Sequence, residues 1–269
     1  MNNISHAMRT HLIFNDLHIP YHQPDVLGAI LGFGREFQPD QIDIPGDLLD
    51  CIGLTLKYRA AQRDERVHRV QFEIDQGQAF LKLLRDLFPK VDIHLHEGNH
   101  EDRLNRYVNQ HCPELRGLHG LSVPGLLDLA GLKITWHPLG QLGVYGNLHI
   151  THGDLIRQHS AYTARSMLEK YGVCVLFGHT HRGGVYYKTA GRKTWAAWEN
   201  FCTCRFDMPW VVGCSNWQHG FSVVHNDMRT RFHVQQVPII GGQFVYAGQE
   251  FRVNRQSADL VRDIKRAKV

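Results

Sequence analysis

Five short apolar segments of this chain each end in a cluster of Asp, His or Asn residues. Apolar runs of this length are typical of buried strands. The pairs of segment and cluster are 10–14 with Asp16-x-His18, 42–44 with Gly46-Asp47-x-x-Asp50, 91–95 with Gly98-Asn99-His100-Glu101, 146–151 with His152-Gly153, and 173–177 with Gly178-His179-x-His181. In open α/β sheets, ligands bind at the carboxyl ends of the strands. The pattern therefore predicts an α/β fold whose site is assembled from five strand ends.

Helical periodicity fills much of the sequence between these strands. It predicts helices over 25–37, 54–87, 102–110 and 159–171, and the turn-bounded apolar runs predict further strands over 132–136, 184–189, 194–201, 220–225 and 231–237. Residues 250–269 are basic and are predicted to form a C-terminal helix or tail. Because the chain shows no internal repeat and no low-complexity linker, we predict a single domain spanning 1–269.

The composition restricts the class of protein further. No apolar run approaches the roughly 20 residues that span a bilayer, and the first residues do not resemble a signal peptide, so we expect a cytoplasmic protein with no membrane partner. The six cysteines form no CxxC pair, and Cys202, Cys204 and Cys214 are interpreted as core or hairpin residues rather than a zinc knuckle. The net charge of +4 is compatible with an anionic substrate, and the oligomeric state stays open.

The five clusters combine carboxylate, imidazole and amide donors, which suit divalent ions such as Mn, Fe, Zn or Co. One ion cannot use this many ligands. The simplest arrangement is therefore two ions that share one carboxylate. Pairs of ions about 3.5–4 Å apart stabilise both the attacking and the leaving oxygen of an in-line displacement at phosphorus. The donor set therefore indicates phosphoryl chemistry.

The order and spacing of the clusters from residue 16 to residue 181 resemble the calcineurin-like metallophosphoesterase superfamily. This resemblance implies a four-layer αββα sandwich of two mixed β-sheets flanked by helices, with a dinuclear metal site at the strand ends. It implies that one ion is held by Asp16, His18 and His181, the other by Asn99, His152 and His179, and that Asp47 bridges them. Mn²⁺ is the ion we expect first, with Fe, Zn, Co or Ni as alternatives. The run from Gly98 to Leu104 and the segment 216–221 also look similar to phage and prophage phosphoesterases.

The resemblance also implies catalytic roles. A hydroxide between the ions would attack phosphorus, His100 would protonate the leaving alkoxide, and Asp50 would orient the imidazole of His100. Arg103 would clamp a phosphate, because a guanidinium matches two phosphate oxygens, and an exposed helix arginine is the alternative. His22 is a candidate for the pocket wall, with an ordinary loop histidine as the favoured alternative, and Asp154 is a candidate partner for a ligand imidazole.

Each motif alone has an ordinary explanation. Asp-x-His and His-x-His pairs often cap or face solvent, Gly-Asp-x-x-Asp often opens a helix, and Asn99 and His152 fit a left-handed turn and a core histidine. Five such motifs in one order favour a metal site. The arginines and lysine between Lys57 and Arg69 predict either a track for a phosphate backbone or a solvated face. The tryptophans are predicted to be mainly core, with one or two stacking on a base or packing at a subunit contact: Trp195, Trp198, Trp210 and Trp217.

Three functions follow from these residues. The favoured one is a phosphodiesterase acting on nucleic acid, DNA or RNA, or on nucleotides. The second is a phosphomonoesterase acting on small phosphorylated substrates or a phosphoprotein, and the third is a catalytically silent scaffold, which the complete ligand set disfavours. Ser/Thr protein phosphatases are disfavoured because Cys51-Ile52-Gly53 replaces their Arg-Gly and because the final Gly-His-x-His pair is intact.

Overall fold

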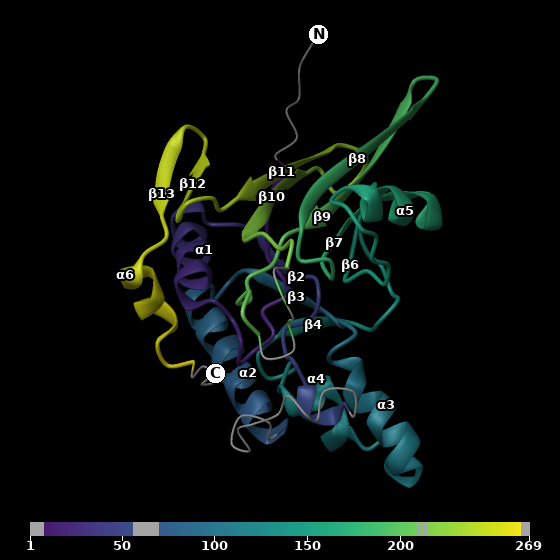
Figure 1. The fold of residues 1–269 in the computed structure, drawn as a ribbon, viewed down its shortest axis with the longest axis vertical. Coiled ribbons are helices and arrows are strands. Elements are labelled where there is room, and N and C mark those ends of the chain that lie inside the picture. The colour runs from purple at the N-terminus through teal and green to yellow at the C-terminus, as the bar shows by residue number, and fades with distance from the viewer. Residues whose placement is uncertain (1–7, 56–69, 209–210, 212, 214, 265–269) are drawn as a thin grey trace.

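The computed structural model describes residues 8–55, 70–208, 211, 213 and 215–264, and its larger sheet has six strands in the order β11-β10-β1-β2-β3-β4 (Figure 1). The bounds of these strands are β1 (Arg9–Ile13), β2 (Gln41–Ile44), β3 (Asp92–His96), β4 (Ile134–His137), β10 (Gly220–Asn226) and β11 (Phe232–Pro238). Strands β1 to β4 are parallel, whereas β10 runs antiparallel to β1 and β11 antiparallel to β10. Every residue of β2 is buried, as expected for a parallel strand covered on both faces.

A second sheet of five strands has the order β5-β6-β7-β9-β8. Its strands are β5 (Gly143–Tyr145), β6 (Leu148–Thr151), β7 (Cys174–Phe177), β8 (Gly183–Ala190) and β9 (Lys193–Asn200). Strands β6, β7 and β9 are parallel, and the two edge strands β5 and β8 are antiparallel to their neighbours. The sheets face each other across a core that includes Ile13 and Val224 from the larger sheet and Ile150, Leu176 and Trp198 from the smaller one.

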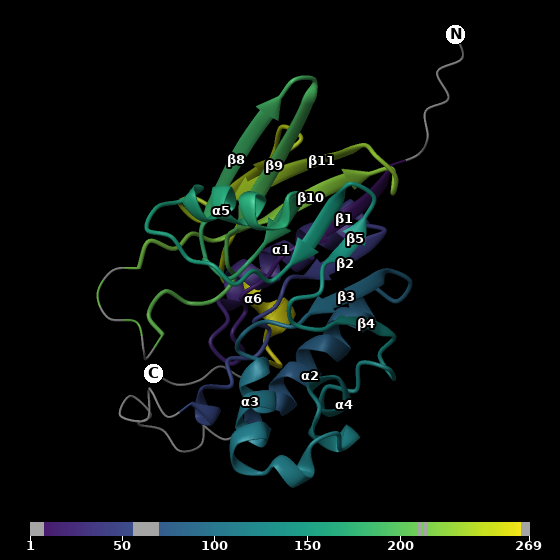
Figure 2. The same ribbon diagram turned by 90° about the vertical axis from the view of Figure 1, so that its right-hand side faces the viewer.

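Helices cover the outer face of each sheet. On the larger sheet, α1 (Pro24–Phe37) and α2 (Val70–Leu87) place Leu27 and Phe80 in one apolar cluster with Ile42. Burying each such side chain contributes about 1.5–3 kcal/mol. On the smaller sheet, α5 (Tyr162–Tyr171) packs Met167 and Leu168 against β7. Helices α1 and α5 thus lie on opposite flanks of the molecule (Figures 1 and 2). The four-layer αββα sandwich is confirmed.

For most of the predicted helices and strands, the observed boundaries lie within three residues of the predicted ones. The predicted helix over 54–87 differs, because Leu54 belongs to a short 3₁₀ turn (Ile52–Leu54) and α2 begins at Val70. The basic run from Lys57 to Arg69, predicted to be a track for a phosphate backbone or a solvated face, lies outside the described residues. The predicted helix over 102–110 is confirmed as α3 (Asp102–His111). The loop after it holds two 3₁₀ turns (Pro113–Leu115, His119–Leu121) and α4 (Val123–Leu126).

The C-terminal segment packs onto the body of the protein. After β11, a two-stranded hairpin of β12 (Gln243–Tyr246) and β13 (Gln249–Arg252) leads to α6 (Arg255–Ala258) and a 3₁₀ turn (Asp259–Val261), which contact α1. Val261 and Ile264 are buried there, whereas residues 265–269 are not described. Among the described residues, no helix has the length and apolarity to cross a bilayer. The cytoplasmic location stays a prediction.

Candidate metal centre

The side chains predicted to bind metal all lie just beyond the carboxyl end of a strand. Asp16 and His18 follow β1, Asp47 follows β2, Asn99 follows β3, His152 follows β6, and His179 and His181 follow β7. These five strands belong to both sheets, so the centre lies where the edges of the two sheets meet. Asn99, His100 and His179 are half-buried, whereas the other members are buried, so these three mark its open side.

One group of donors comprises Asp16, His18, Asp47 and His181. The Nε2 atoms of His18 and His181 lie 3.0 Å apart. Oδ1 of Asp16 lies 3.2 Å from His181 Nε2, and Oδ2 of Asp47 lies 3.6 Å from His18 Nε2. Two carboxylates and two imidazole nitrogens thus face one point, and this chemistry fits a divalent transition metal.

A second group of donors comprises Asp47, His152 and His179. His152 Nε2 lies 3.1 Å from His179 Nδ1, 2.9 Å from Asn99 Oδ1 and 3.3 Å from Asp47 Oδ2. Asp47 therefore belongs to both groups, as a bridging carboxylate requires. The structure brings together all seven residues predicted as ligands, in the two sets predicted.

Most of these residues have unusual backbone conformations. Asp16, His18, Asp47, His179 and His181 have φ between 49° and 70°, the left-handed region. Residues other than glycine enter this region at a cost of about 1–3 kcal/mol each, and such residues cluster at functional sites. The folded chain therefore holds these side chains in place at the expense of stability.

Two glycines allow the loops of the centre to approach closely. A Cβ atom on Gly178 would lie 2.6 Å from both Asn15 Nδ2 and Asp16 Oδ2. A Cβ atom on Gly98 would overlap the carboxylate and backbone nitrogen of Asp47. Any larger residue at either position would displace a candidate ligand.

His100 lies at the mouth of the centre beside Asp47 and Asp50. Its Nδ1 is 2.8 Å from the backbone oxygen of Asp50 and 3.5 Å from Asp50 Oδ2, and its Nε2 is 3.8 Å from Asp47 Oδ2. Burial lowers the pKa of His100, but the carboxylates of Asp47 and Asp50 outweigh burial and raise the pKa above its usual value. A proton on His100 Nε2 would therefore face the centre, in the position of a general acid.

Asp50 and Arg103 surround this imidazole. The side chain of Asp50 lies 3.0 Å from His18 Nδ1, so it orients His18 at least as closely as His100. Arg103 donates from Nη1 to the backbone oxygen of Asp50 at 2.7 Å and from Nη2 to His100 Nε2 at 3.0 Å. Because both ends of the guanidinium are engaged, the structure places Arg103 against His100, and the phosphate clamp stays a prediction.

Sequence reasoning gave no role to Glu101. Its fully buried carboxylate accepts the backbone N–H groups of Asp47, Leu49 and Gly98 at 3.1, 2.7 and 2.8 Å. Burial and the nearby Asp47 raise the pKa of Glu101 to about 7, and the N–H donors oppose this rise. Glu101 thus connects the loops after β2 and β3. The only sequence feature that could have pointed to Glu101 was its position next to His100.

Two further buried groups support the loops of the centre. Asn15 donates from Nδ2 to Asp16 Oδ2 and, at 3.1 Å, to the backbone oxygen of Phe201. Glu73 in α2 accepts the backbone N–H of Cys51, and burial together with Asp50 raises the pKa of Glu73 well above its usual value. No sequence motif marks either residue, because the contacts of Asn15 with Phe201 and of Glu73 with Cys51 join segments that are distant in the sequence.

The centre concentrates negative charge among imidazoles. Burial alone would raise the pKa of Asp47, but the imidazoles of His100 and His152 hold it well below its usual range. Burial lowers the pKa of His152, and Asp47 outweighs burial and raises it to about 10. The carboxylate that both groups share is therefore ionised at neutral pH, as a cation site requires.

The other candidates lie differently. Asp154 pairs with Lys170 on the surface, and the ring partner of His152 is the backbone oxygen of Pro45, so the prediction that Asp154 holds a ligand imidazole is wrong. His22 is buried beside Cys204, and Trp198 is in the core. Trp217 lies edge-on to His181, with ring centroids 4.2 Å apart. Trp210 and Cys214 lie outside the described residues.

The fold, the donor set and the sequence together identify the protein family. Residues 10–183 match the model of the calcineurin-like phosphoesterase family, and the chain belongs to that family. The resemblance predicted from the five motifs is confirmed. Members of the family generally use a dinuclear divalent metal centre, and this chain has candidate ligands for one.

The chain is similar to a phage protein in sequence and to several proteins of known structure. The chain is similar to the gene 54 protein of Mycobacterium phage L5, with 28% identity over 258 residues that cover 90% of this chain and 98% of that protein. It is also similar to Vps29 of Chaetomium thermophilum (TM-score 0.46, 12% identity, 91% of this chain and 100% of that chain). A third match is Yfce, a phosphoesterase from E. coli (TM-score 0.41, 11% identity, 91% and 100%). Family membership and the donor set together support a hydrolase of phosphate esters.

Proposed function

We propose that this protein is a dinuclear metal-dependent phosphodiesterase that acts on nucleic acid or nucleotides. The observation that carries the proposal is the position of Asp47, whose Oδ2 lies between His18 and His152 at 3.6 and 3.3 Å. One carboxylate shared by two sets of donors is the arrangement that two adjacent ions need. We expect Mn²⁺ first, because oxygen and imidazole donors accept it readily.

Each residue of the centre has a definite task in this proposal. Asp16, His18 and His181 would hold one ion, Asn99, His152 and His179 the other, and Asp47 both. When bound, the ions activate water and neutralise charge on the phosphoryl oxygens. His100 would deliver a proton from Nε2 to the leaving oxygen, while the backbone oxygen of Asp50, which can only accept, keeps the Nδ1 proton in place. The N–H of Arg103 Nη2 that lies against Nε2 would have to turn away first, because a protonated Nε2 accepts no hydrogen bond.

The charge at the open side favours a diester. A phosphate diester carries one negative charge, whereas a monoester carries up to two and needs more cationic groups. At the open side Arg103 is engaged with Asp50 and His100, and Asn99 and His179 add no fixed charge. A protonated His100 would lie against the carboxylates of Asp47 and Asp50, which offset its charge. The net charge of +4 supports a polyanionic substrate such as DNA or RNA.

A phosphomonoesterase is the second candidate, because Arg103 retains 15% side-chain exposure beside His100 and a dianionic phosphate would attract it. One experiment separates the two. The protein is stripped with a chelator and refilled with Mn²⁺, and hydrolysis of bis(p-nitrophenyl) phosphate and of p-nitrophenyl phosphate is compared, with Asp47→Asn as the inactive control.

Metal-dependent cleavage of the diester, lost in Asp47→Asn, supports the proposal. Preference for the monoester assigns the second candidate. Activity on an oligonucleotide that falls steeply with salt adds nucleic acid as the substrate, because phosphate contacts release counterions. Absence of metal-dependent activity on all three substrates overturns both candidates.

A further inference from the structure

Three histidines of the centre hold Nδ1 against an oxygen atom. The Nδ1 atom lies 3.0 Å from Asp50 Oδ2 in His18, 2.8 Å from the Pro45 backbone oxygen in His152, and 2.8 Å from the Asp50 backbone oxygen in His100. A carbonyl oxygen only accepts, so His152 and His100 carry a proton on Nδ1. In a neutral ring the lone pair is then on Nε2, which faces the centre.

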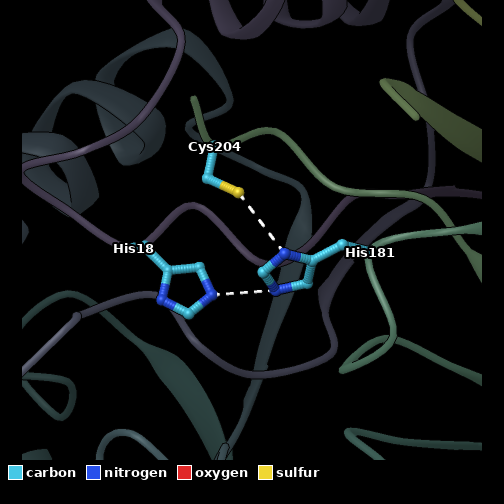
Figure 3. A group of neighbouring side chains, drawn as sticks. All are labelled: His18, His181 and Cys204. Atoms are coloured by element: carbon cyan, nitrogen blue, oxygen red, sulfur yellow. Dashed lines mark hydrogen bonds between the residues drawn. The ribbon is translucent and has the colours of Figure 1, made fainter. Parts of the chain in front are cut away.

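His181 has the same orientation but a different partner. Its Nε2 faces the centre, 3.2 Å from Asp16 Oδ1 and 3.0 Å from His18 Nε2, whereas its Nδ1 lies 3.7 Å from the sulfur of Cys204. Figure 3 shows the ring of His181 between Cys204 on one side and His18 on the other. The sulfur thus occupies the place that oxygen atoms occupy beside the other three rings.

The backbone fixes the position of this sulfur. Cys204 is fully buried and forms an isolated β-bridge with His22, four residues after His18. Its backbone oxygen lies 2.8 Å from His219 Nε2, and the next residue donates its N–H to the Tyr21 backbone oxygen at 2.9 Å. On another side of His181, the Trp217 ring restricts rotation of the imidazole.

We propose that Cys204 is a positioning residue of the centre: its sulfur accepts the Nδ1–H of His181 and keeps the Nε2 lone pair directed at Asp16 and His18. A neutral imidazole has one N–H, so a partner that accepts at Nδ1 selects the tautomer able to bind a cation through Nε2. The proposal rests on the proposed function in that His181 is taken as a ligand. Loss of such a partner typically lowers metal affinity 10–100-fold.

The test compares Cys204→Ala and Cys204→Ser with Cys202→Ala. Cys202 is the control, because it is equally buried and two residues away, and its sulfur contacts the Gln218 backbone oxygen and the side chain of Cys204 but no histidine of the centre. Stripped proteins are titrated with Mn²⁺ by calorimetry, and Tm is measured for each. We expect Cys204→Ala to weaken one of two binding events 10–100-fold, Cys204→Ser to recover part of the loss, and Cys202→Ala to match the wild type.

Wild-type affinity in Cys204→Ala overturns the proposal, and so does an equal loss in Cys202→Ala, which would indicate general damage to the core. Substitution with Co²⁺ provides a spectroscopic criterion. A sulfur-to-cobalt charge-transfer band that disappears in Cys204→Ala would show that the sulfur is a ligand, which also overturns a positioning role.

A measurement on the metal-free protein separates this proposal from the proposed function. Nitrogen-15 NMR of the histidine rings reports which ring nitrogen of His181 carries the proton. We expect the Nδ1–H form in the wild type and in Cys202→Ala, and a mixture of forms in Cys204→Ala. An Nε2–H form in the wild type overturns the proposal, whether or not the protein is a phosphodiesterase. Failure of the wild type to bind two ions, with the Nδ1–H form intact, counts against the proposed function alone.

Discussion

The carboxylate of Glu101 accepts the backbone N–H of Asp47 at 3.1 Å, across 54 residues of sequence. The same carboxylate accepts two more N–H groups, from Leu49 and Gly98. One buried side chain therefore sets the distance between the loop that carries the bridging carboxylate and the loop that carries Asn99 and His100. The relative positions of the candidate ligands on these two loops depend on this contact, although Glu101 binds neither an ion nor the substrate in the proposed function.

Replacing Glu101 with Gln tests this dependence. The amide keeps the volume but places an NH₂ group against a backbone N–H, which costs about 1–3 kcal/mol. We expect lower stability in urea and weaker Mn²⁺ binding by calorimetry. Glu97→Gln is the matched control, because Glu97 is also buried and accepts the Leu139 N–H at 2.9 Å in the same loop. Equal loss of metal binding in both variants would contradict a specific role for Glu101.

His100→Ala tests the general acid. Removal of a general acid typically slows a reaction 10²–10⁴-fold. We expect a loss of this size with an oligonucleotide, whose alkoxide leaving group needs a proton, and a much smaller loss with bis(p-nitrophenyl) phosphate, whose phenolate leaves unaided. Rates are measured at saturating Mn²⁺, and metal content is determined for the variant. The same loss on both substrates would argue against proton transfer by His100.

The clusters that supply the candidate ligands could be predicted from the sequence because their evidence is local: each donor follows its strand within five residues. The assignment of these donors to two ions came from the resemblance to the family. The partners of those donors could not be predicted. Glu101 and Cys204 act on Asp47 and His181, which packing brings close, and the sequence around them does not identify these contacts.

The omissions in the fold have a similar origin. Strand β5 has three residues, the apolar run of β12 is only three residues long (244–246), and β13 has a single apolar residue, so none shows the longer apolar run that marks a strand. The left-handed backbone at five candidate ligands could not be predicted either, because only a few per cent of non-glycine residues adopt this region, although Asp and His do so more often than most. The surrounding structure imposes that conformation.

A second group of histidines, between the sheets, predicts how stability depends on pH. His137 stacks on His96 with ring centroids 4.3 Å apart, and its Nε2 lies 2.9 Å from His94 Nδ1. Burial, with the neighbouring His96 and His94, lowers the pKa of His137 from its usual 6.5 to about 4. Between these pH values the unfolded chain binds more protons than the folded one, so the free energy of unfolding rises with pH.

We therefore expect Tm to fall as pH decreases from about 6.5 to about 4, and to fall less in His137→Gln. The difference between the two Tm curves isolates the contribution of His137 from that of the buried carboxylates. His119→Gln is the control, because His119 is exposed. Parallel curves for the wild type and His137→Gln would show that this imidazole contributes nothing to the dependence.

Gly178→Ala tests whether close approach of the loops sets the geometry of the centre. The added Cβ would lie 2.6 Å from Asp16 Oδ2 and Asn15 Nδ2, so Asp16 must move away from His181. We expect weaker binding of one Mn²⁺ ion and lower stability. Gly32→Ala in α1 is the control: nothing lies within 4 Å of its added Cβ, and an alanine in a helix interior is favoured by about 0.5–1 kcal/mol. If Gly178→Ala binds two ions as the wild type does while Gly32→Ala gains stability, the contact between the β7 loop and Asp16 does not control the centre.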